Sequence, residues 1–404
     1  MSTALPVPPI SSSKSTPGDG VHDDTAFIQE QLDSRRATIH LPPPAVRYLI
    51  SRPLIIHSRQ SLILDPGTVI RLAPQSNCLM ITNDDHAGGN EEISVIGGIW
   101  DMDNRQQEPN PIRQICRDKN LSQPYDPNRY LGIAMRFVGV TRFALKNITF
   151  RDPVTFCTQF ARLQYFTIDD ITFDFQHWNP VPHNMDGIHL DGGCRHGRIT
   201  NLKGATYDDL LAINADDVEA ESPGVGPIED ISVDGIYATD CQSVVRILSA
   251  GSPVRRISIS NVHATCYLYG IGFTKYFKRE TKGSIDAITL RNIHLAKAPR
   301  LPHYLRDKSP DFPLLWIEGG LVVHHLTIDR IHRDESVSTA PLLRVDQGAE
   351  VETLILRDVS VRNRLDAPMD TILNEGVIGH VALPDGAPDD ILVNRGTVAK
   401  VSRS

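Results

Sequence analysis

The sequence lacks the features of a membrane-spanning, zinc-binding or disulfide-rich protein. No apolar run approaches the roughly 20 residues that a membrane-spanning helix needs. The six cysteines are scattered, without a C-x-x-C pair or a Cys/His spacing that suits zinc, so we predict buried free thiols. Residues 1–17 lack the regions of a signal peptide and are rich in Pro and Ser, which predicts a flexible arm. We therefore expect a cytoplasmic protein, or a secreted one whose leader is absent from this sequence.

Basic charge and aromatic residues are also scarce. The formal net charge is -8, which argues against nucleic acid and anionic membranes as partners. Aromatic residues make up 6% of the chain and only three of them are Trp, which disfavours a non-catalytic protein that binds glycans through exposed rings. Nothing in the composition indicates a cofactor or an oligomeric state.

A short β pattern recurs along most of the chain. In FALKNI at Phe143 or ISISNV at Ile257, apolar residues alternate with polar ones, and the fifth position is usually Asn, Asp or Gly. The alternation directs one side of the segment into a core, and these three residue types tolerate the left-handed backbone of a corner. Successive fifth positions lie 23 to 38 residues apart, the length of one solenoid turn. They are Asn147, Asp170, Asn201, Gly235, Asn261, Asn292, Arg330 and Asp358.

This spacing predicts an all-β fold, a single-stranded right-handed parallel β-helix that forms one domain over residues 18–404. The strands of a sandwich would recur about every 8–12 residues. The L-x-x-L-x-L-x-x-N signature of a leucine-rich horseshoe is absent. Unequal spacing also predicts loop insertions at residues 101–130, 173–183 and 296–312, which we expect to form the walls of a groove.

A short helix is predicted to cap the N-terminal end of the β-helix. Asp23 or Asp24 can serve as its N-cap. Its apolar face is predicted to carry Ala26, Phe27 and Leu32.

Acidic side chains concentrate in residues 183–217, where the apolar residues keep the alternation of strands. We expect the functional site to be a cluster of carboxylates on a rigid sheet. For Asp216 and Asp217 we predict a structural role in turns, which is common for Asp at β-helix corners. For His196 a structural or solvent-facing role is likewise expected.

Two acidic motifs stand about one repeat apart in this stretch. NMDG occupies residues 184–187 and YDDLLAIN occupies residues 207–214, with 22 positions between Asp186 and Asp208. They resemble the N-T-D-G and G-D-D-x-x-A-I signatures of glycoside hydrolase family 28, the polygalacturonase-like enzymes of the pectin-lyase-like superfamily. The resemblance implies that Asp186, Asp208 and Asp209 are catalytic and that Arg246, in a segment similar to the family's R-I-K, binds substrate. The full predicted substrate-binding set is His183, Asn184, His189, Arg246 and Lys275.

The departures from the family pattern bear on the substrate. Leu248 stands where R-I-K has its lysine, and Val225 stands where a G-H-G histidine is expected. Two polar contacts to an acidic sugar are therefore missing, which predicts a neutral or mixed glycan in place of polygalacturonate. Lys275, one repeat later, could restore the lost cation.

Glycosidic cleavage needs a proton donor and a base or nucleophile on either side of the bond. The resemblance implies inversion, with Asp208 as the acid and with Asp186 and Asp209 holding the attacking water. The sequence thus predicts a glycoside hydrolase that acts on an oligo- or polysaccharide without a metal.

Two other functions remain open. One is a polysaccharide lyase in which Ca²⁺ neutralises a uronate and a basic residue such as Arg195, Lys203 or Arg246 removes a proton. The other is the non-catalytic glycan-binding β-helix protein. Their products differ, because a lyase makes an unsaturated sugar, a hydrolase makes a new reducing end, and a binding protein makes neither.

Overall fold

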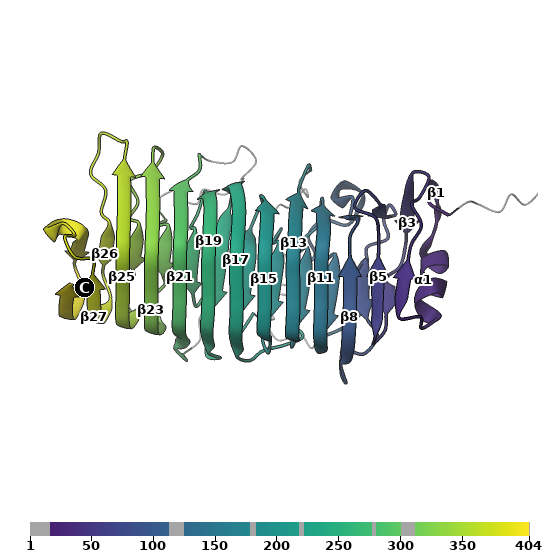
Figure 1. Ribbon diagram of the computed structural model, residues 1–404, viewed down its shortest axis with the longest axis horizontal. Helices are drawn as coiled ribbons and strands as arrows, with labels where there is room; N and C mark the ends of the chain where they lie inside the picture. The colour runs from purple at the N-terminus through teal and green to yellow at the C-terminus, as the bar shows by residue number, and fades with distance from the viewer. Residues whose placement is uncertain are drawn as a thin grey trace, which may run out of the picture.

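The computed structural model describes residues 17–112, 125–177, 183–217, 222–276, 280–299 and 312–403. Their strands stack in parallel along the long axis of the molecule, and successive coils lie side by side (Figure 1). This arrangement is the predicted right-handed parallel β-helix. Nearly all of the predicted N-terminal arm lies outside the described residues.

The larger sheet contains 17 strands within the described residues. The eight predicted corner positions all have a left-handed backbone, with φ from +52° to +86°, so that part of the prediction is confirmed. Each corner bends the strand that contains it while hydrogen bonding to the neighbouring coils continues. The strands are β1 (Asp19–Asp23), β2 (Thr38–His40), β3 (Arg47–Ile50), β5 (Gln60–Ile63), β6 (Val69–Leu72), β8 (Asn90–Ile96), β9 (Ile99–Asp101), β11 (Val140–Arg151), β13 (Gln164–Asp174), β15 (Arg195–Gly204), β17 (Ile228–Cys241), β19 (Val254–Cys266), β21 (Gly283–Lys297), β23 (Leu321–Glu335), β25 (Glu350–Asn363), β27 (Val377–Leu383) and β29 (Thr397–Arg403).

The smaller sheet contains 12 shorter strands within the same residues and carries the acidic motifs. Its strands are β4 (Leu54–Ile56), β7 (Ile81–Asn83), β10 (Met135–Val138), β12 (Thr158–Ala161), β14 (Ile188–Asp191), β16 (Asp209–Asn214), β18 (Ser243–Leu248), β20 (Ile271–Thr274), β22 (Leu315–Ile317), β24 (Leu343–Val345), β26 (Ile372–Asn374) and β28 (Leu392–Asn394). Two short 3-10 helices, η1 (Asn104–Gln106) and η2 (Asp389–Ile391), lie outside the sheets.

The core runs the length of the β-helix between the two sheets. In the smaller sheet Ile188, Leu211 and Val245 occupy the same register on three successive coils, and all three are fully buried. Because strand side chains alternate between two faces, the intervening residues of these strands point outward. That outward face is where the candidate site lies.

The predicted capping helix is α1 (Thr25–Asp33), which lies beside the first coils (Figure 1). Its buried face consists of Thr25, Ile28 and Leu32, with Phe27 partly buried. Ala26 is exposed, so the prediction was wrong there, because the helix begins at Thr25 and the preceding Asp24 is turned inward to accept hydrogen bonds from other segments.

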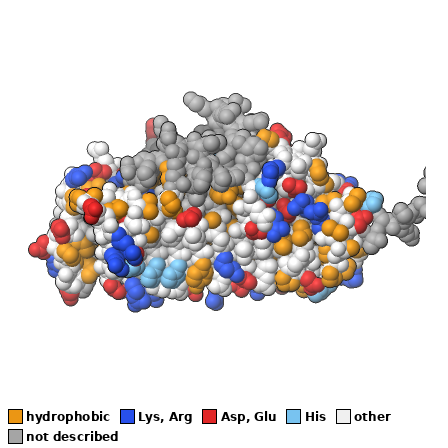
Figure 2. Space-filling model, turned by 90° about the horizontal axis from the view of Figure 1, so that it is seen from above, with side chains coloured by type: hydrophobic (Ala, Val, Ile, Leu, Met, Phe, Trp, Pro, Cys, Tyr) orange, Lys and Arg blue, Asp and Glu red, His pale blue; other side chains and the backbone are white. Residues whose placement is uncertain are grey.

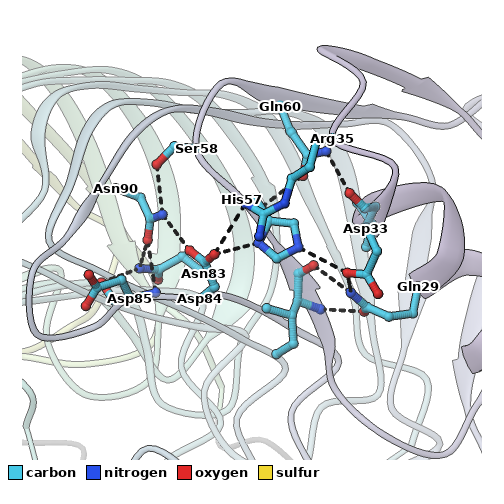
Figure 3. Close-up of polar contacts among 12 residues, drawn as sticks. Gln29, Asp33, Arg35, His57, Ser58, Gln60, Asn83, Asp84, Asp85 and Asn90 are labelled. Carbon is cyan, nitrogen blue, oxygen red and sulfur yellow. Dashed lines mark hydrogen bonds and ion pairs between the residues drawn. The ribbon is translucent and has the colours of Figure 1, made fainter.

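A polar network fixes α1 to the coils (Figure 3). His57 contacts Asp84 through Nδ1 at 2.5 Å and Asp33 of α1 through Nε2 at 3.1 Å. Gln29 accepts a hydrogen bond from the Ile55 backbone and donates one back to its carbonyl. The helix is thus held by side-chain contacts in addition to its apolar face.

The surface and the thiols agree with the composition. Acidic and basic side chains are interspersed on the face seen in Figure 2, where histidine side chains also gather toward the C-terminal half. His263 and His294, on β19 and β21, stack with ring centroids 4.5 Å apart.

The five cysteines among the described residues are free, and four of them are buried. Within these residues no helix is long and apolar enough to cross a membrane.

Candidate functional site

The two acidic motifs lie side by side where two neighbouring strands of the smaller sheet begin. Asp186 precedes β14 and Asp209 begins β16, and these strands pair in parallel. The backbone N–H of Gly187 donates to the Asp209 carbonyl at 2.9 Å, so the two motifs touch directly. The 22-residue separation in the sequence therefore corresponds to one coil.

Gly187 permits this close approach. A Cβ at this position would lie 2.4 Å from the Leu210 carbonyl oxygen and 2.6 Å from the Phe173 ring. Such a contact is shorter than real side-chain contacts allow, so only glycine fits between the two coils. Asn184 adds a left-handed turn with φ +59°, which helps bring Asp186 to the start of its strand.

The adjacent residues Asp208 and Asp209 have different surroundings. Asp208 is partly buried and accepts hydrogen bonds from Gln242 Nε2 at 2.7 Å and from the Asn184 backbone N–H at 3.1 Å. Asp209 is fully buried, and its Oδ1 accepts a 2.9 Å hydrogen bond from the Tyr269 hydroxyl. Neighbouring carboxylates in different environments can take different roles in catalysis.

His189 connects Asp186 to a second pair of carboxylates. Its Nδ1 lies 2.9 Å from Asp186, and its Nε2 lies 3.3 Å from Asp191 and 3.4 Å from Asp217. One face of the ring stacks on Phe156, with centroids 4.1 Å apart and planes 14° apart. His189 is therefore enclosed on several sides.

The charge of His189 follows from these contacts. Burial alone favours the neutral ring, but the hydrogen bonds to Asp186, Asp191 and Asp217 prevail and raise the pKa of His189 well above its ordinary value. The imidazole is thus held as a cation beneath the aspartates. The geometry favours action through Asp186 over the direct substrate contact that the sequence suggested for His189.

Arg246 is the second cation of the site. Its guanidinium lies 3.3 Å from Asp209 and 3.7 Å from Asp217, and its Nε donates to Asn214 at 3.4 Å. Burial opposes the charged form, but Asp209 is the strongest of the neighbours that raise the pKa of Arg246. The side chain also lies over the exposed ring of Tyr276, at 5.6 Å from the centroid.

The site contains more aspartates than cations, and burial raises the pKa of several of these carboxyl groups. Burial raises the pKa of Asp186 to about 7, although its hydrogen bond with His189 acts in the opposite direction. Burial also raises the pKa of Asp209 and of Asp191, while the Arg246 charge lowers that of Asp209. The site therefore holds at least one carboxyl that gains or loses its proton near neutral pH.

The remaining predicted residues lie at the margin of the cluster. Asn184 contributes its backbone N–H to Asp208, and the His183 carbonyl accepts a hydrogen bond from Asn110 Nδ2 at 2.5 Å. Lys275 follows β20, where its backbone N–H donates to Glu318. Its side chain lies along the turn at Gly320, since a Cβ built there would be 3.0 Å from the lysine Cδ. His196 is on β15 of the other sheet, where it stacks on Tyr165.

The structural role in a turn that the sequence predicts for Asp216 and Asp217 fits the contacts of Asp216 but not those of Asp217. Asp216 accepts hydrogen bonds from the backbone N–H groups of Ala250 and Ser252, both at 2.8 Å, as expected of a turn-stabilising residue. Asp217 instead lies between the two cations of the site. Its place one residue beyond a corner gave no sign of this, because the contact depends on how neighbouring coils align.

The structure also describes the two residues at which the sequence departs from the signatures that it resembles. Leu248 is fully buried at the end of β18, and Val225 is 56% exposed. Neither can supply a charge to a bound sugar. Among the described residues, no group of three or more His, Cys, Asp or Glu side chains is arranged to hold a metal ion.

Comparison with known proteins identifies the fold. No family model matches the chain, and no curated protein matches it. Among solved structures, a Yersinia enterocolitica family 28 exopolygalacturonase has a TM-score of 0.60 at 15% identity, covering 96% of this chain and 76% of that one. The Streptococcus pneumoniae surface adhesin PfbA has a TM-score of 0.56 at 13% identity over 96% and 91% of the two chains. A tailspike protein of E. coli bacteriophage HK620, in complex with a hexasaccharide, has a TM-score of 0.56 at 12% identity over 98% and 76%.

Proposed function

We propose that this protein is a glycoside hydrolase that cleaves a neutral or mixed oligo- or polysaccharide by an inverting mechanism. The observation that carries the proposal is the meeting of Asp186, Asp208 and Asp209 where the neighbouring strands β14 and β16 begin, two of them buried and one partly accessible. A hydrolase needs carboxyl groups in such unequal environments, because one must give a proton while another accepts one. A family 28 enzyme and a saccharide-bound tailspike among proteins of the same fold support a glycan substrate.

In this proposal Asp208 gives its proton to the leaving oxygen, and Asp186 and Asp209 hold the attacking water. The assignment of Asp208 rests on the family resemblance and on its accessibility. The two buried aspartates each contact a cation, since His189 lies 2.9 Å from Asp186 and Arg246 lies 3.3 Å from Asp209.

The preference for a neutral or mixed glycan rests on the surroundings of Arg246. Its charge faces Asp209 and Asp217, and the next outward position on β18 is the buried Leu248. A polyuronate carries one negative charge per sugar and needs cations that are not already neutralised. Such a polymer is therefore a poor fit to this site.

A panel of neutral, mixed and uronate oligosaccharides tests the function, with products identified by mass spectrometry. We expect a new reducing end from a neutral or mixed glycan and little release from polygalacturonate. An unsaturated product would identify a lyase, and binding without any product would identify a glycan-binding protein. Efficient release from polygalacturonate that is lost in Lys275→Ala would contradict the substrate preference, since the missing cation would then come from Lys275.

The rate should depend on pH through Asp186. If Asp186 must be ionised to hold and deprotonate water, its pKa of about 7 means that the active form diminishes as pH falls below 7. We expect kcat/KM to decrease about tenfold per pH unit below that value. Initial rates between pH 5 and 8.5 measure this. A rate that instead decreases from pH 6 to 8 would assign the proton-donating role to Asp186.

A further inference from the structure

One outward-facing position recurs on nine successive strands of the smaller sheet, from β7 to β24. The strand register aligns these positions into a row, which we call the outward row. Neighbouring positions are separated by the spacing of paired strands, about 4.8 Å. From the N-terminal side, the row runs through Thr82, Arg136, Gln159, His189, Ala212, Arg246, Gly272, Trp316 and Arg344.

On the N-terminal side of the aspartates this row is covered. Arg136, Gln159 and His189 are polar and point outward, yet each is 0% exposed. The guanidinium of Arg136 lies 5.5 Å from the centroid of the Tyr125 ring and donates to the Pro127 carbonyl at 3.4 Å. Outward polar residues become this deeply buried only where another segment lies over the sheet.

The described residues that lie over this part of the row come from between β9 and β10, as Tyr125 and Pro127 on Arg136 show. We call these residues, 102–112 and 125–134, the barrier. Its apolar residues Ile112, Leu131 and Ile133 form a buried cluster with Leu79 and Phe156. Phe156 in turn stacks on His189, so the barrier is in contact with the floor of the aspartate site.

Hydrogen bonds fix the barrier at both of its ends. Asn104 Nδ2 donates to the carbonyls of Pro153 and His177, at 3.1 and 2.9 Å. The Thr155 hydroxyl donates to the Leu131 carbonyl at 2.7 Å. A glycan could continue past the aspartates in this direction only by breaking these bonds and exposing the apolar cluster.

On the C-terminal side, the described residues leave several side chains of the row partly exposed, although Gly272 is buried against the Tyr269 ring. Arg246 is 17% exposed, Arg344 is 24% exposed and Tyr276 beside Arg246 is 55% exposed. Trp316 is partly exposed, and its indole N–H donates to Asp346 at 2.7 Å, which fixes the ring. Phe312 and Tyr269 pack against the same indole. A fixed aromatic ring beside charged side chains suits the apolar face and the hydroxyl groups of a sugar.

From this asymmetry we infer that the enzyme acts at a chain end. The inference rests on the proposed function and adds its mode of action. The terminal sugar lies over the aspartates against the barrier, and the rest of the chain extends over β18 to β24 toward Trp316. Water attacks the anomeric carbon of the terminal glycosidic bond and gives up a proton to the carboxylates that hold it. The bond to the leaving oxygen breaks, and that oxygen takes the proton of Asp208. The products are a short terminal unit and a chain shortened by that unit.

The size distribution of the early products tests whether the enzyme acts at a chain end. The glycan that the panel identifies is supplied as linear oligosaccharides of two to six residues labelled at the reducing end with 2-aminobenzamide. At less than about a tenth of complete conversion, we expect each length to yield only the terminal unit and its complement. Internal fragments from the hexamer would overturn the chain-end mode while leaving the hydrolase proposal intact. Absence of cleavage in every panel member would overturn both.

The open side is tested with a matched pair of variants. Trp316→Ala should raise KM for the pentamer several-fold more than KM for the dimer, because only a longer chain reaches the indole. The control is Tyr237→Ala, which removes another exposed aromatic ring, on β17 of the other sheet, where Tyr237 stacks on His263. It should leave both KM values unchanged. Equal effects of Trp316→Ala on both lengths, or a length-dependent effect of Tyr237→Ala, would contradict the inferred direction of the chain.

Discussion

Replacing Asp186, Asp208 or Asp209 by Asn is expected to lower kcat by about 10²–10⁴-fold in each case, the usual contribution of a positioned acid or base. The amide keeps the shape of the side chain and removes only its ability to exchange a proton. The thermal midpoint should change little, since the amide has the same size and the cations keep other partners: Arg246 keeps Asp217, and His189 keeps Asp191 and Asp217. Steady-state rates and thermal melts of each variant measure the two effects separately.

Asp216→Asn is the matched control for this series. Asp216 belongs to the same acidic stretch, but its carboxylate accepts two backbone hydrogen bonds and holds a turn. Its replacement should lower the free energy of unfolding by about 1–2 kcal/mol and leave kcat of the folded protein close to the wild-type value. Wild-type turnover in any one of the three catalytic variants would remove that residue from the mechanism.

Arg246→Met is expected to have the largest effect on stability. The guanidinium is the shared partner of Asp209 and Asp217, both nearly inaccessible to water. Its loss leaves the buried carboxylate of Asp209 without its closest countercharge, which typically costs about 3–5 kcal/mol, whereas Asp217 keeps His189. Protonation of the carboxyls relieves this penalty. The pKa of Asp209 is already raised by burial and should rise further, so the difference from wild type should be smaller at pH 5 than at pH 8.

Urea unfolding at the two pH values measures this effect. Arg151→Met provides the comparison, because Arg151 pairs with Asp174 at 2.8 Å on the other sheet and both side chains are partly solvated. That variant should lose at most about 1 kcal/mol at either pH. If Arg246→Met were no more destabilised than Arg151→Met, the electrostatic account of the site would be wrong.

The architecture could be predicted because each coil repeats the same local constraint. A residue such as Asn261 or Gly235 at the fifth position reports a left-handed corner without reference to the rest of the chain, and both have positive φ. The spacing of the two acidic motifs was equally informative, since one coil brings Gly187 against Asp209. These features are local or repeat with a fixed period.

Other contacts of the site join residues from different coils, and no pattern in the sequence predicts them. Gln242 and Tyr269, which bind Asp208 and Asp209, come from the next coils, and no motif marks them. Asp217 was assigned to a turn because Asp is common at β-helix corners, whereas its contacts with His189 and Arg246 depend on how neighbouring coils align. The insertion at residues 101–130 was predicted as a wall, but its contact with Phe156 and hence with His189 could be seen only in three dimensions.

The most direct test of the central claim is proton NMR of the first product formed from the panel glycan. With Asp208 as the proton donor and with Asp186 and Asp209 holding the attacking water, we predict a new reducing end whose anomeric configuration is opposite to that of the cleaved bond, observed before mutarotation. Asp208→Asn should give no such signal within the same time. A product with retained configuration, or an unsaturated sugar, would contradict the account.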